Sequence, residues 1–332
     1  MKSIKNQRKI SVIIPTYNRS ELLSYTLDSL VAQNIDKKYF EVIVADDGST
    51  DDTRAVAKTY ESKLNLKYVF QEDMGYRPAS ARNLGIMYAE SEICLFIDSG
   101  VILDENCVNS HIRFHERCVD DSVAIGYIYG FEENNHYASL LKQIINVSNA
   151  TKSITDIALN PIFCDVRETH YIKYYDRLED LPAAWIYFWT ANVSSLKRNL
   201  LAVELFDTNY DGKWGVEDND LGFRLHRAGV KICLLRSAKS IHYPHPKDKE
   251  QRHKEGFENC IYFYKKFQTP DIKIFLDNFL KDELIDVNEI YMEIEANTIL
   301  ETLKNDTMDK EMKVQNQNTR ELVPDGSLKI SM

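Results

Sequence analysis

Short apolar runs alternate with amphipathic segments along the first hundred residues. Four runs rich in β-branched and aromatic side chains predict buried strands at residues 10–14, 41–45, 66–70 and 93–97. Between them, apolar residues recur at helical spacing and predict helices at residues 20–33, 51–61 and 78–90. Strands that are apolar throughout and alternate with helices are typical of a parallel sheet covered on both faces. The pattern therefore predicts an α/β fold.

The rest of the chain is less regular. Its patterns predict helices at 104–118 and 217–229, strands at 122–130, 185–195 and 231–235, and mostly helical structure at 256–303. Residues 132–180 are polar and aromatic and follow neither period. From about residue 304 the chain is polar with little apolar periodicity, which indicates a disordered tail.

Composition narrows the class of protein. Hydrophobic residues make up 44% of the chain and charged residues 28%, a balance that can bury a sizeable core. The net charge of −10 argues against a protein that works by coating nucleic acid. We find no apolar run long enough for a transmembrane helix, no signal core and no paired cysteines. These features favour a cytoplasmic protein, with peripheral membrane contact left open.

A polar cluster follows each of the four predicted strands. The clusters are Pro15-Thr16-Tyr17-Asn18, then Asp46-Asp47-Gly48-Ser49, then Gly75-Tyr76-Arg77 leading to Arg82-Asn83, and finally Asp98-Ser99-Gly100. One such cluster is what any turn would show. Four on neighbouring strands would line one edge of a parallel sheet, where ligands of such sheets bind. Carboxylates, arginines and backbone donors together favour a nucleotide.

Two further groups lie in the second half of the chain. Trp214 and Gly215 precede Glu217 and Asp218 at the start of a predicted helix. Acids at a helix N-terminus are favourable by about 0.3–1 kcal/mol, but that does not account for the aromatic residue and the glycine before them. His242 and His245 follow a predicted strand in a Pro-rich segment, where they either have a structural role or hold a metal ion.

These segments together resemble the family 2 glycosyltransferases of the GT-A fold. The stretches SVIIPTYNRSELLSYTLDSLVAQ, VIVADDGSTDDT, GYRPASARNLGI and FIDSG are similar to the nucleotide-binding half of that family. The stretch from Trp189 to WGVEDNDLGFRLHRAGV resembles the acceptor half of chondroitin-polymerase-like and galactosyltransferase-like enzymes. The resemblance covers about residues 9–246.

The resemblance implies a GT-A fold with a mostly parallel nucleotide-binding sheet flanked by helices. With the patterns above, it divides the chain into four parts. These are a nucleotide-sugar-binding half (1–103), an acceptor and catalytic half (104–250), a helical C-terminal extension (251–303) and a polar tail (304–332).

The resemblance also implies an inverting hexosyl- or N-acetylhexosaminyl-transferase that uses a nucleotide-diphosphate sugar, most often a UDP-sugar. Asp218 corresponds to the general base and Glu217 to a contact with a sugar hydroxyl. The implied nucleotide-binding residues are Pro15, Thr16, Tyr17, Asn18, Asp47, Arg77, Arg82, Asn83 and Asp98. The implied acceptor or sugar contacts are Trp189, Asn192, Trp214 and Gly215. The acceptor stays open among a glycan, a lipid-linked glycan, a peptide and a small molecule.

A divalent cation, Mn²⁺ or Mg²⁺, is part of what the resemblance implies. Asp98 takes the place of the first acid of the metal motif, and His242, with His245 as its rival, takes the place of a late histidine. Gly100 replaces the second acid of that motif. We therefore expect a site with fewer protein ligands, weak metal binding, or a cationic side chain in the place of the metal.

Two other classes of protein fit part of the pattern. A sugar nucleotidyltransferase would be expected to carry a Gly-rich phosphate loop after its first strand, whereas this chain has PTYNRS there. A nucleotide-sugar-binding protein without activity would be expected to lack Glu217 or Asp218, and both are present. The sequence favours an enzyme.

Overall fold

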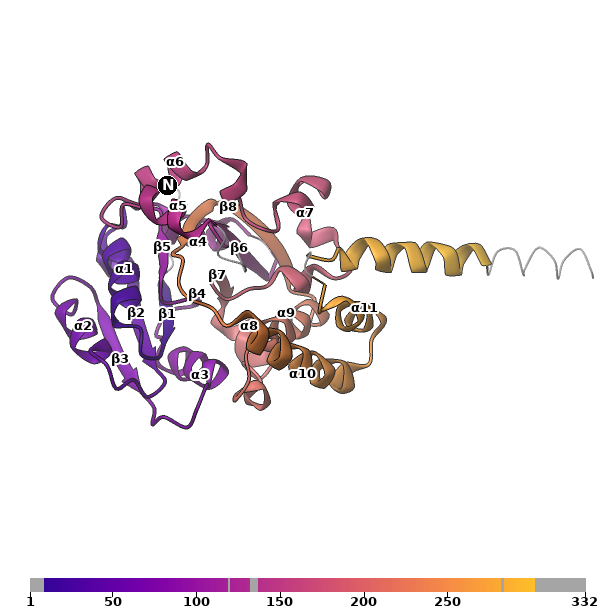
Figure 1. Cartoon of the computed structure of the whole chain (residues 1–332), viewed down its shortest axis with the longest axis horizontal. Helices are drawn as coiled ribbons and strands as arrows, with labels where there is room; N and C mark the ends of the chain where they lie inside the picture. The colour runs from indigo at the N-terminus through magenta and orange to yellow at the C-terminus, as the bar shows by residue number, and fades with distance from the viewer. Residues whose placement is uncertain (1–8, 119, 132–136, 282–283, 302–332) are drawn as a thin grey trace, which may run out of the picture.

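The computed structural model describes residues 9–118, 120–131, 137–281 and 284–301 (Figure 1). Within these residues the core is one eight-stranded sheet in the order β3-β2-β1-β4-β7-β6-β8-β5. The strands are β1 (Ile10–Thr16), β2 (Phe40–Asp46), β3 (Leu66–Phe70), β4 (Ile93–Ile97), β5 (Val101–Leu103), β6 (Ser122–Tyr129), β7 (Asn192–Leu196) and β8 (Lys231–His242).

The first four strands run parallel, as the sequence predicts. β1 pairs with β2 and β4, and β2 pairs with β3. β6 is also parallel to β8, whereas β7 is antiparallel to both β4 and β6, and β5 is antiparallel to β8. The α/β fold with a mostly parallel sheet is confirmed. Because β4 and β7 pair directly, the two halves that we expected to meet at residue 103 share one sheet, and the boundary between them stays a prediction.

Both faces of the parallel strands are covered by helices. Val12 and Ile13 are neighbours on β1, so their side chains point to opposite faces, yet both are fully buried. Helices α1 (Ser20–Val31) and α2 (Thr53–Thr59) pack against each other, and α3 (Pro78–Tyr88) packs on β1 and β2. Gly85 lets α3 approach closely, because a Cβ there would lie 2.4 Å from a methyl carbon of Ile13. This packing explains why the strands lack polar alternation.

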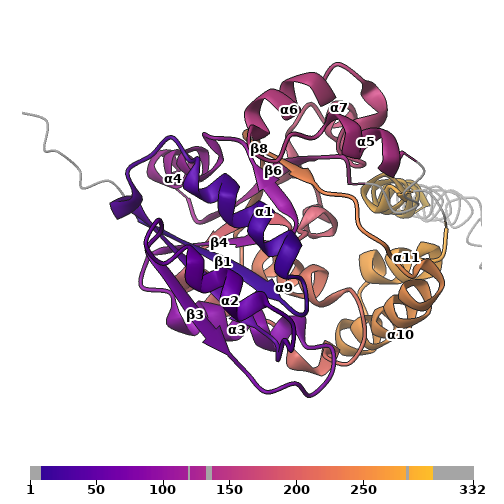
Figure 2. The ribbon, with the colours of Figure 1, turned by 60° about the vertical axis from the view of Figure 1, so that its left-hand side comes forward.

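The second half supplies the remaining helices. They are α4 (Cys107–Arg117), α5 (Ala138–Ile144), α6 (Ala150–Ile157), α7 (Glu168–Lys173), α8 (Lys197–Ala202), α9 (Glu217–Arg227), α10 (Lys249–Phe267) and α11 (Pro270–Asn278). Figure 2 shows α5, α6 and α7 gathered in one place, α10 and α11 in another, and the segment after β8 running between them. Residues 287–301 are helical as well and extend away from the rest of the protein (Figure 1).

Three sequence predictions need correction. Ala184–Tyr187 forms a short 3₁₀ helix rather than a strand, and β7 begins only at Asn192. A short apolar run does not distinguish a strand from another buried segment, and this one is apolar because it packs in the core. β8 continues to His242, since a register shift beside Gly126 keeps it paired with β6.

The third correction concerns the C-terminal extension, whose first helix begins at Lys249 rather than at 256. Asp248 caps this helix by accepting a hydrogen bond from the backbone N–H of Gln251, at 3.0 Å. The tail from residue 304, for which we predict disorder, lies outside the described residues. In the ranges that the structure describes, every helix is too short or too polar to cross a bilayer.

Candidate active site

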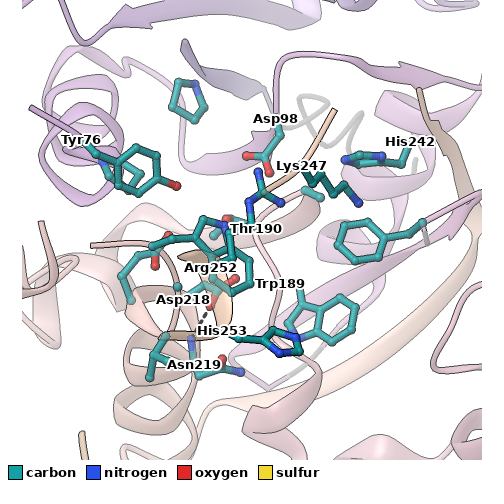
Figure 3. A pocket seen from close by; sticks show the side chains of 18 of the residues that line it. Tyr76, Asp98, Trp189, Thr190, Asp218, Asn219, His242, Lys247, Arg252 and His253 are labelled. Atoms are coloured by element: carbon teal, nitrogen blue, oxygen red, sulfur yellow. Dashed lines mark hydrogen bonds between the residues drawn. The ribbon is translucent and has the colours of Figure 1, made fainter. Parts of the chain in front are cut away.

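One large cavity, of about 530 Å³, opens at the carboxyl ends of β1, β2 and β4 (Figure 3). The loops after these strands form one wall, the start of α9 forms a second, and the segment from β8 to α10 forms a third. The predicted site residues that line it are Pro15, Thr16, Tyr17, Asp47, Arg82, Asp98, Trp189, Trp214, Gly215, Glu217, Asp218, His242 and His245. The fold therefore brings together most of the residues that the sequence singles out.

Asp47 is held in place by the loop that follows β3. One of its carboxylate oxygens accepts a hydrogen bond from the backbone N–H of Arg77 at 2.7 Å, and the other accepts one from the Gln71 side chain at 2.6 Å. The Arg77 guanidinium lies 3.2 Å from the same carboxylate. Arg77 is thus a neighbour of Asp47 rather than part of the cavity wall, and its contact with a nucleotide stays a prediction.

Asn18 connects two of the loops at this edge of the sheet. Its side-chain oxygen accepts hydrogen bonds from the backbone N–H groups of Thr50, at 2.8 Å, and Asp51, at 3.2 Å. Its own N–H donates to the Ser49 hydroxyl at 2.8 Å. Asn18 also adopts a left-handed backbone conformation, with φ of 48°. The residue therefore joins the loops after β1 and β2, although it does not line the cavity.

Asn83 and Asn192, which we expected to contact the nucleotide and the acceptor, bond elsewhere. The Asn83 amide donates to the Phe206 carbonyl at 2.8 Å and accepts from the Phe206 N–H at 2.9 Å. Asn192 is fully buried, and its amide donates to the Ala238 carbonyl and the Ser240 hydroxyl, both at 3.0 Å. Neither side chain lines the cavity. Their polar atoms satisfy nearby backbone and core groups, and their contacts with a ligand stay predictions.

Arg82 connects the two sides of the cavity. Its Nη1 lies 2.9 Å from Oε1 of Glu217, and its Nη2 lies 3.2 Å from Oδ1 of Asp98. Burial lowers the pKa of the guanidinium, but the charges of Asp98, Glu217 and Asp218 outweigh that effect and raise it. Arg82 is therefore a buried permanent cation between the end of β4 and the start of α9.

The turn before α9 has an uncommon backbone. Gly215 and Val216 are both left-handed, with φ of 90° and 75°. Glycine adopts this conformation readily, whereas a β-branched valine does so only under constraint from its surroundings. Asn259 of α10 supplies one such constraint by donating to the Gly215 carbonyl at 2.8 Å. The constrained turn places Glu217 at the first position of α9 and Asp218 beside the cavity.

The two acids at the start of α9 differ in their surroundings. Glu217 is paired with Arg82 through one oxygen, while its buried Oε2 has no hydrogen-bond partner among the described residues. Asp218 accepts a hydrogen bond from the Asn219 N–H at 2.8 Å (Figure 3). Burial and the charge of Glu217 raise the pKa of Asp218 to about 7, although Arg82 acts in the opposite direction. Asp218 therefore exchanges a proton near neutral pH.

His242 and His245 meet at the end of β8, with ring centroids 5.3 Å apart. Burial and the nearby charge of Lys247 lower the pKa of His242 well below its usual value. Burial and the charge of Arg19 lower the pKa of His245 to about 4. Both rings are thus neutral at pH 7, the form that can bind a metal ion.

A complete set of metal ligands does not form around these histidines. Asp98 is already bonded to Arg82, and Gly100 offers no second carboxylate. Among the residues that the structure describes, there is no group of three or more His, Cys, Asp or Glu side chains that could hold a metal ion. Asp98 with His242 or His245 therefore does not fit a metal site made by the protein alone.

Sequence reasoning missed several residues of the cavity wall. Phe131, Thr190, Lys247 and Arg252 all line it, and so does Tyr76, which belongs to a strand-end cluster but had no predicted role. A signal for the last two is present in the sequence, because basic residues are frequent from 247 to 254 in a chain that is acidic overall. Lys247 and Arg252 lie just after residue 246, where the family resemblance ends.

The aromatic residues divide between the core and the cavity. Trp185 is fully buried and donates from its indole nitrogen to Asp271 at 2.8 Å. Trp189, four residues on, lines the cavity (Figure 3), and the Arg167 guanidinium lies 4.6 Å from its ring centroid. Trp185, Tyr187 and Phe188 are fully buried, so of these four aromatic residues only Trp189 is placed to meet a ligand.

Comparisons with known proteins agree with the resemblance seen in the sequence. Residues 11–169 match the profile described as Glycosyl transferase family 2. The chain carries a family 2 glycosyltransferase domain. It is 37% identical over 257 residues to a validoxylamine A glucosyltransferase of Streptomyces hygroscopicus subsp. jinggangensis, covering 77% of this chain and 60% of the relative. It is 30% identical over 275 residues to an Escherichia coli chondroitin synthase, covering 77% of this chain and 39% of the relative.

Solved structures show that the fold of this family 2 domain is the GT-A fold. The Staphylococcus aureus protein TarS, residues 1–349 in complex with UDP-GlcNAc, matches with a TM-score of 0.57 at 20% identity, over 82% of this chain and 71% of that one. A mannosyltransferase of Pyrobaculum calidifontis in complex with GDP-Man and Mn²⁺ matches with a TM-score of 0.53 at 15% identity, over 83% and 69%. The chain covers 60% of the length of the validoxylamine A glucosyltransferase and 39% of the length of the chondroitin synthase. It therefore spans less than two thirds of the length of these relatives.

Proposed function

We propose that this protein transfers a sugar from a nucleotide-diphosphate donor, most simply a UDP-sugar, to a hydroxyl acceptor with inversion at the anomeric carbon. The observation that carries the proposal is the placement of Asp218, whose pKa is about 7, in the same cavity as the strand-end residues Asp47 and Asp98. The match to family 2 and the glycosyltransferase relatives support it. The UDP-GlcNAc bound to TarS supports the choice of a UDP-sugar.

The donor is expected to lie along the carboxyl ends of β1, β2 and β4. Thr16 and Asp47, which border the cavity there, are suited to the nucleoside. The Thr16 hydroxyl is buried and has no partner among the described residues, so a ligand group can satisfy it. Asp98 marks the end of the site nearest the acids of α9, because Arg82 contacts both Asp98 and Glu217. The sugar then lies between the two walls.

Asp218 is suited to act as the general base. In a single displacement, the acceptor oxygen bonds to the anomeric carbon, its proton passes to the Asp218 carboxylate, and the bond to the diphosphate breaks. The diphosphate keeps the electron pair of that bond. Because attack and departure occur on opposite faces, the configuration at the carbon inverts. A base with a pKa near the working pH accepts a proton without binding it permanently.

Glu217 is less suited to that role. Its ion pair with buried Arg82 engages one carboxylate oxygen, which is therefore not available to take the proton of the acceptor. Its Oε2, buried beside the cavity and without a partner in the described part of the chain, can accept a hydrogen bond from a sugar hydroxyl. We therefore assign Glu217 to sugar binding and Asp218 to proton transfer.

The acceptor is expected to approach past Trp189, Trp214 and Gly215, which line the cavity on the α9 side. Aromatic faces of this kind stack on sugar rings, so a glycan is the acceptor that this wall suits best. Lipid-linked glycans, peptides and small molecules with a hydroxyl group stay as alternatives. Any manganese or magnesium ion that binds takes most of its ligands from the donor diphosphate, because Asp98 is the only acid of the motif.

A donor screen tests the proposal. We expect UDP or a UDP-sugar to raise the melting temperature of the full chain, and the matching UDP-sugar to be hydrolysed slowly to UDP without an acceptor. Product analysis by NMR with an accepted glycan should show the inverted anomer. Binding without any turnover across nucleotide sugars would identify a binding protein instead. Retention of configuration would contradict the assignment of Asp218 as a base.

A further inference from the structure

Basic side chains gather on the wall of the cavity that faces the diphosphate position. Arg19 comes from the loop after β1, Lys247 from the segment between β8 and α10, and Lys249 and Arg252 from α10 itself. The whole chain has a net charge of −10, so this concentration of cations is local. Several cations on one wall of a cavity attract an anionic ligand to that wall.

Two of these cations are joined by a continuous row of rings. The Lys247 ammonium lies 4.8 Å from the Phe131 ring centroid, and the Phe131 ring lies 4.9 Å from the ring of His242. The ring of His245 follows, and its Nε2 is 3.2 Å from Nη1 of Arg19. Figure 3 shows Lys247 and His242 on the side of the cavity where Asp98 lies. This row therefore borders the end of β4, where the donor diphosphate is expected.

Arg252 borders the cavity on the side of the acids. Its guanidinium lies 5.2 Å from the ring centroid of Trp214, the residue that begins the turn into α9. Stacking on an aromatic face fixes the plane of a guanidinium. Lys247 thus lines the cavity from the segment between β8 and α10, and Arg252 lines it from α10.

The motif whose acids usually bind a metal ion is incomplete at the end of β4. Gly100 has a left-handed φ of 97° and no side chain, and the remaining acid, Asp98, is bonded to Arg82. Arg19, Lys247 and Arg252 place side-chain cations near the position expected for the diphosphate. A leaving diphosphate needs such charge, whichever group carries it.

We propose that Lys247 and Arg252, with Arg19, bind the donor diphosphate and neutralise it as it leaves, so that transfer needs no divalent cation. The inference rests on the proposed function and names the residues that serve its leaving group. As the acceptor oxygen bonds to the anomeric carbon, the bond from that carbon to the β-phosphate oxygen breaks and its electrons pass to that oxygen. The new negative charge is taken up by the ammonium and guanidinium groups, while the acceptor proton passes to Asp218.

The experiment measures transfer and nucleotide binding in excess chelator, with the full chain. We expect the wild-type protein to keep its activity within about twofold of that with added manganese. Lys247→Ala and Arg252→Ala should each lower kcat/KM by about 10- to 100-fold, the usual effect of losing a charged hydrogen bond to phosphate. Arg252→Lys should recover part of the loss. Lys254→Ala is the matched control, because Lys254 lies on the exposed side of α10 and should leave activity unchanged.

Binding of UDP and UMP by calorimetry separates the inference from the proposed function. The two alanine substitutions should weaken the binding of UDP more than the binding of UMP, because UMP lacks the second phosphate. If the wild-type protein transfers no sugar but this difference is seen in chelator, the basic cluster is supported and the transferase proposal fails. If chelator abolishes activity and manganese restores it, or if both alanine variants match the wild type, the inference is wrong.

Discussion

The Nη1 atom of Arg82 lies 2.9 Å from the Oε1 atom of Glu217, and both residues are 5% exposed. This contact joins α3 to the first residue of α9. The same guanidinium also reaches Asp98. A buried cation between two carboxylates fixes their separation. Burial and Glu217 raise the pKa of Asp218 beside them, and Arg82 partly opposes that rise.

Removal of Arg82 should destabilise the protein. In Arg82→Gln, Glu217 is left as a buried carboxylate without a cation, and loss of one partner of a buried pair costs about 3–5 kcal/mol. We expect the free energy of unfolding, measured in urea at pH 7.5, to fall by about that amount. The double variant Arg82→Gln/Glu217→Gln should recover part of the loss. Equal stability of the single variant and the wild type would show that the pair is not coupled.

Asp218→Asn keeps the shape of the side chain and removes its basicity. We expect kcat to fall by about 10²- to 10⁴-fold, the usual contribution of a general base, with UDP affinity unchanged by calorimetry. Glu217→Gln should weaken sugar binding and raise KM instead. If Asp218→Asn keeps more than about a tenth of the activity while Glu217→Gln is inactive, the two roles are exchanged.

The rate of transfer should depend on pH through Asp218. The base works only when it is ionised, and its pKa is about 7, so kcat should rise as pH increases through 7 and level off above it. The charge of Glu217 helps to raise this pKa, so Glu217→Gln should move the midpoint to lower pH. A profile that is flat between pH 6 and pH 8 in the wild type would exclude Asp218 as the titrating base.

Asp47→Ala should weaken uridine-nucleotide binding. Asp47 lines the cavity while the Arg77 N–H and the Gln71 amide hold it in place. Loss of its carboxylate leaves a donor on the bound base unpaired, at a cost of about 1–3 kcal/mol, which corresponds to roughly a 5- to 150-fold higher Kd for UDP. Asp52→Ala, at an exposed position in the next turn, is the control. Unchanged UDP affinity in Asp47→Ala would show that the uracil base binds away from Asp47.

Some of the candidate site follows from local sequence alone. Asp47 and Asp98 come directly after strands of continuous apolar residues, and parallel strands bring their carboxyl ends to one edge of the sheet. The position of these residues is therefore predictable without knowledge of the rest of the fold. Asn83 and Asn192 show the limit of this reasoning. Their motifs are those of the site, but which way an amide turns depends on the backbone groups that lie nearby.

By itself, the sequence determined the parallel strands, the polar residues at their ends and the family resemblance, because apolar runs and motif spacings are local properties of the chain. Only the tertiary structure decided that Arg82 lies between Asp98 and Glu217, a residue 135 positions further along. It also decided that Lys247 and Arg252 join the same cavity. Contacts of this kind depend on how β8 and α10 return to the sheet. That path is set by long-range packing, which no local pattern records.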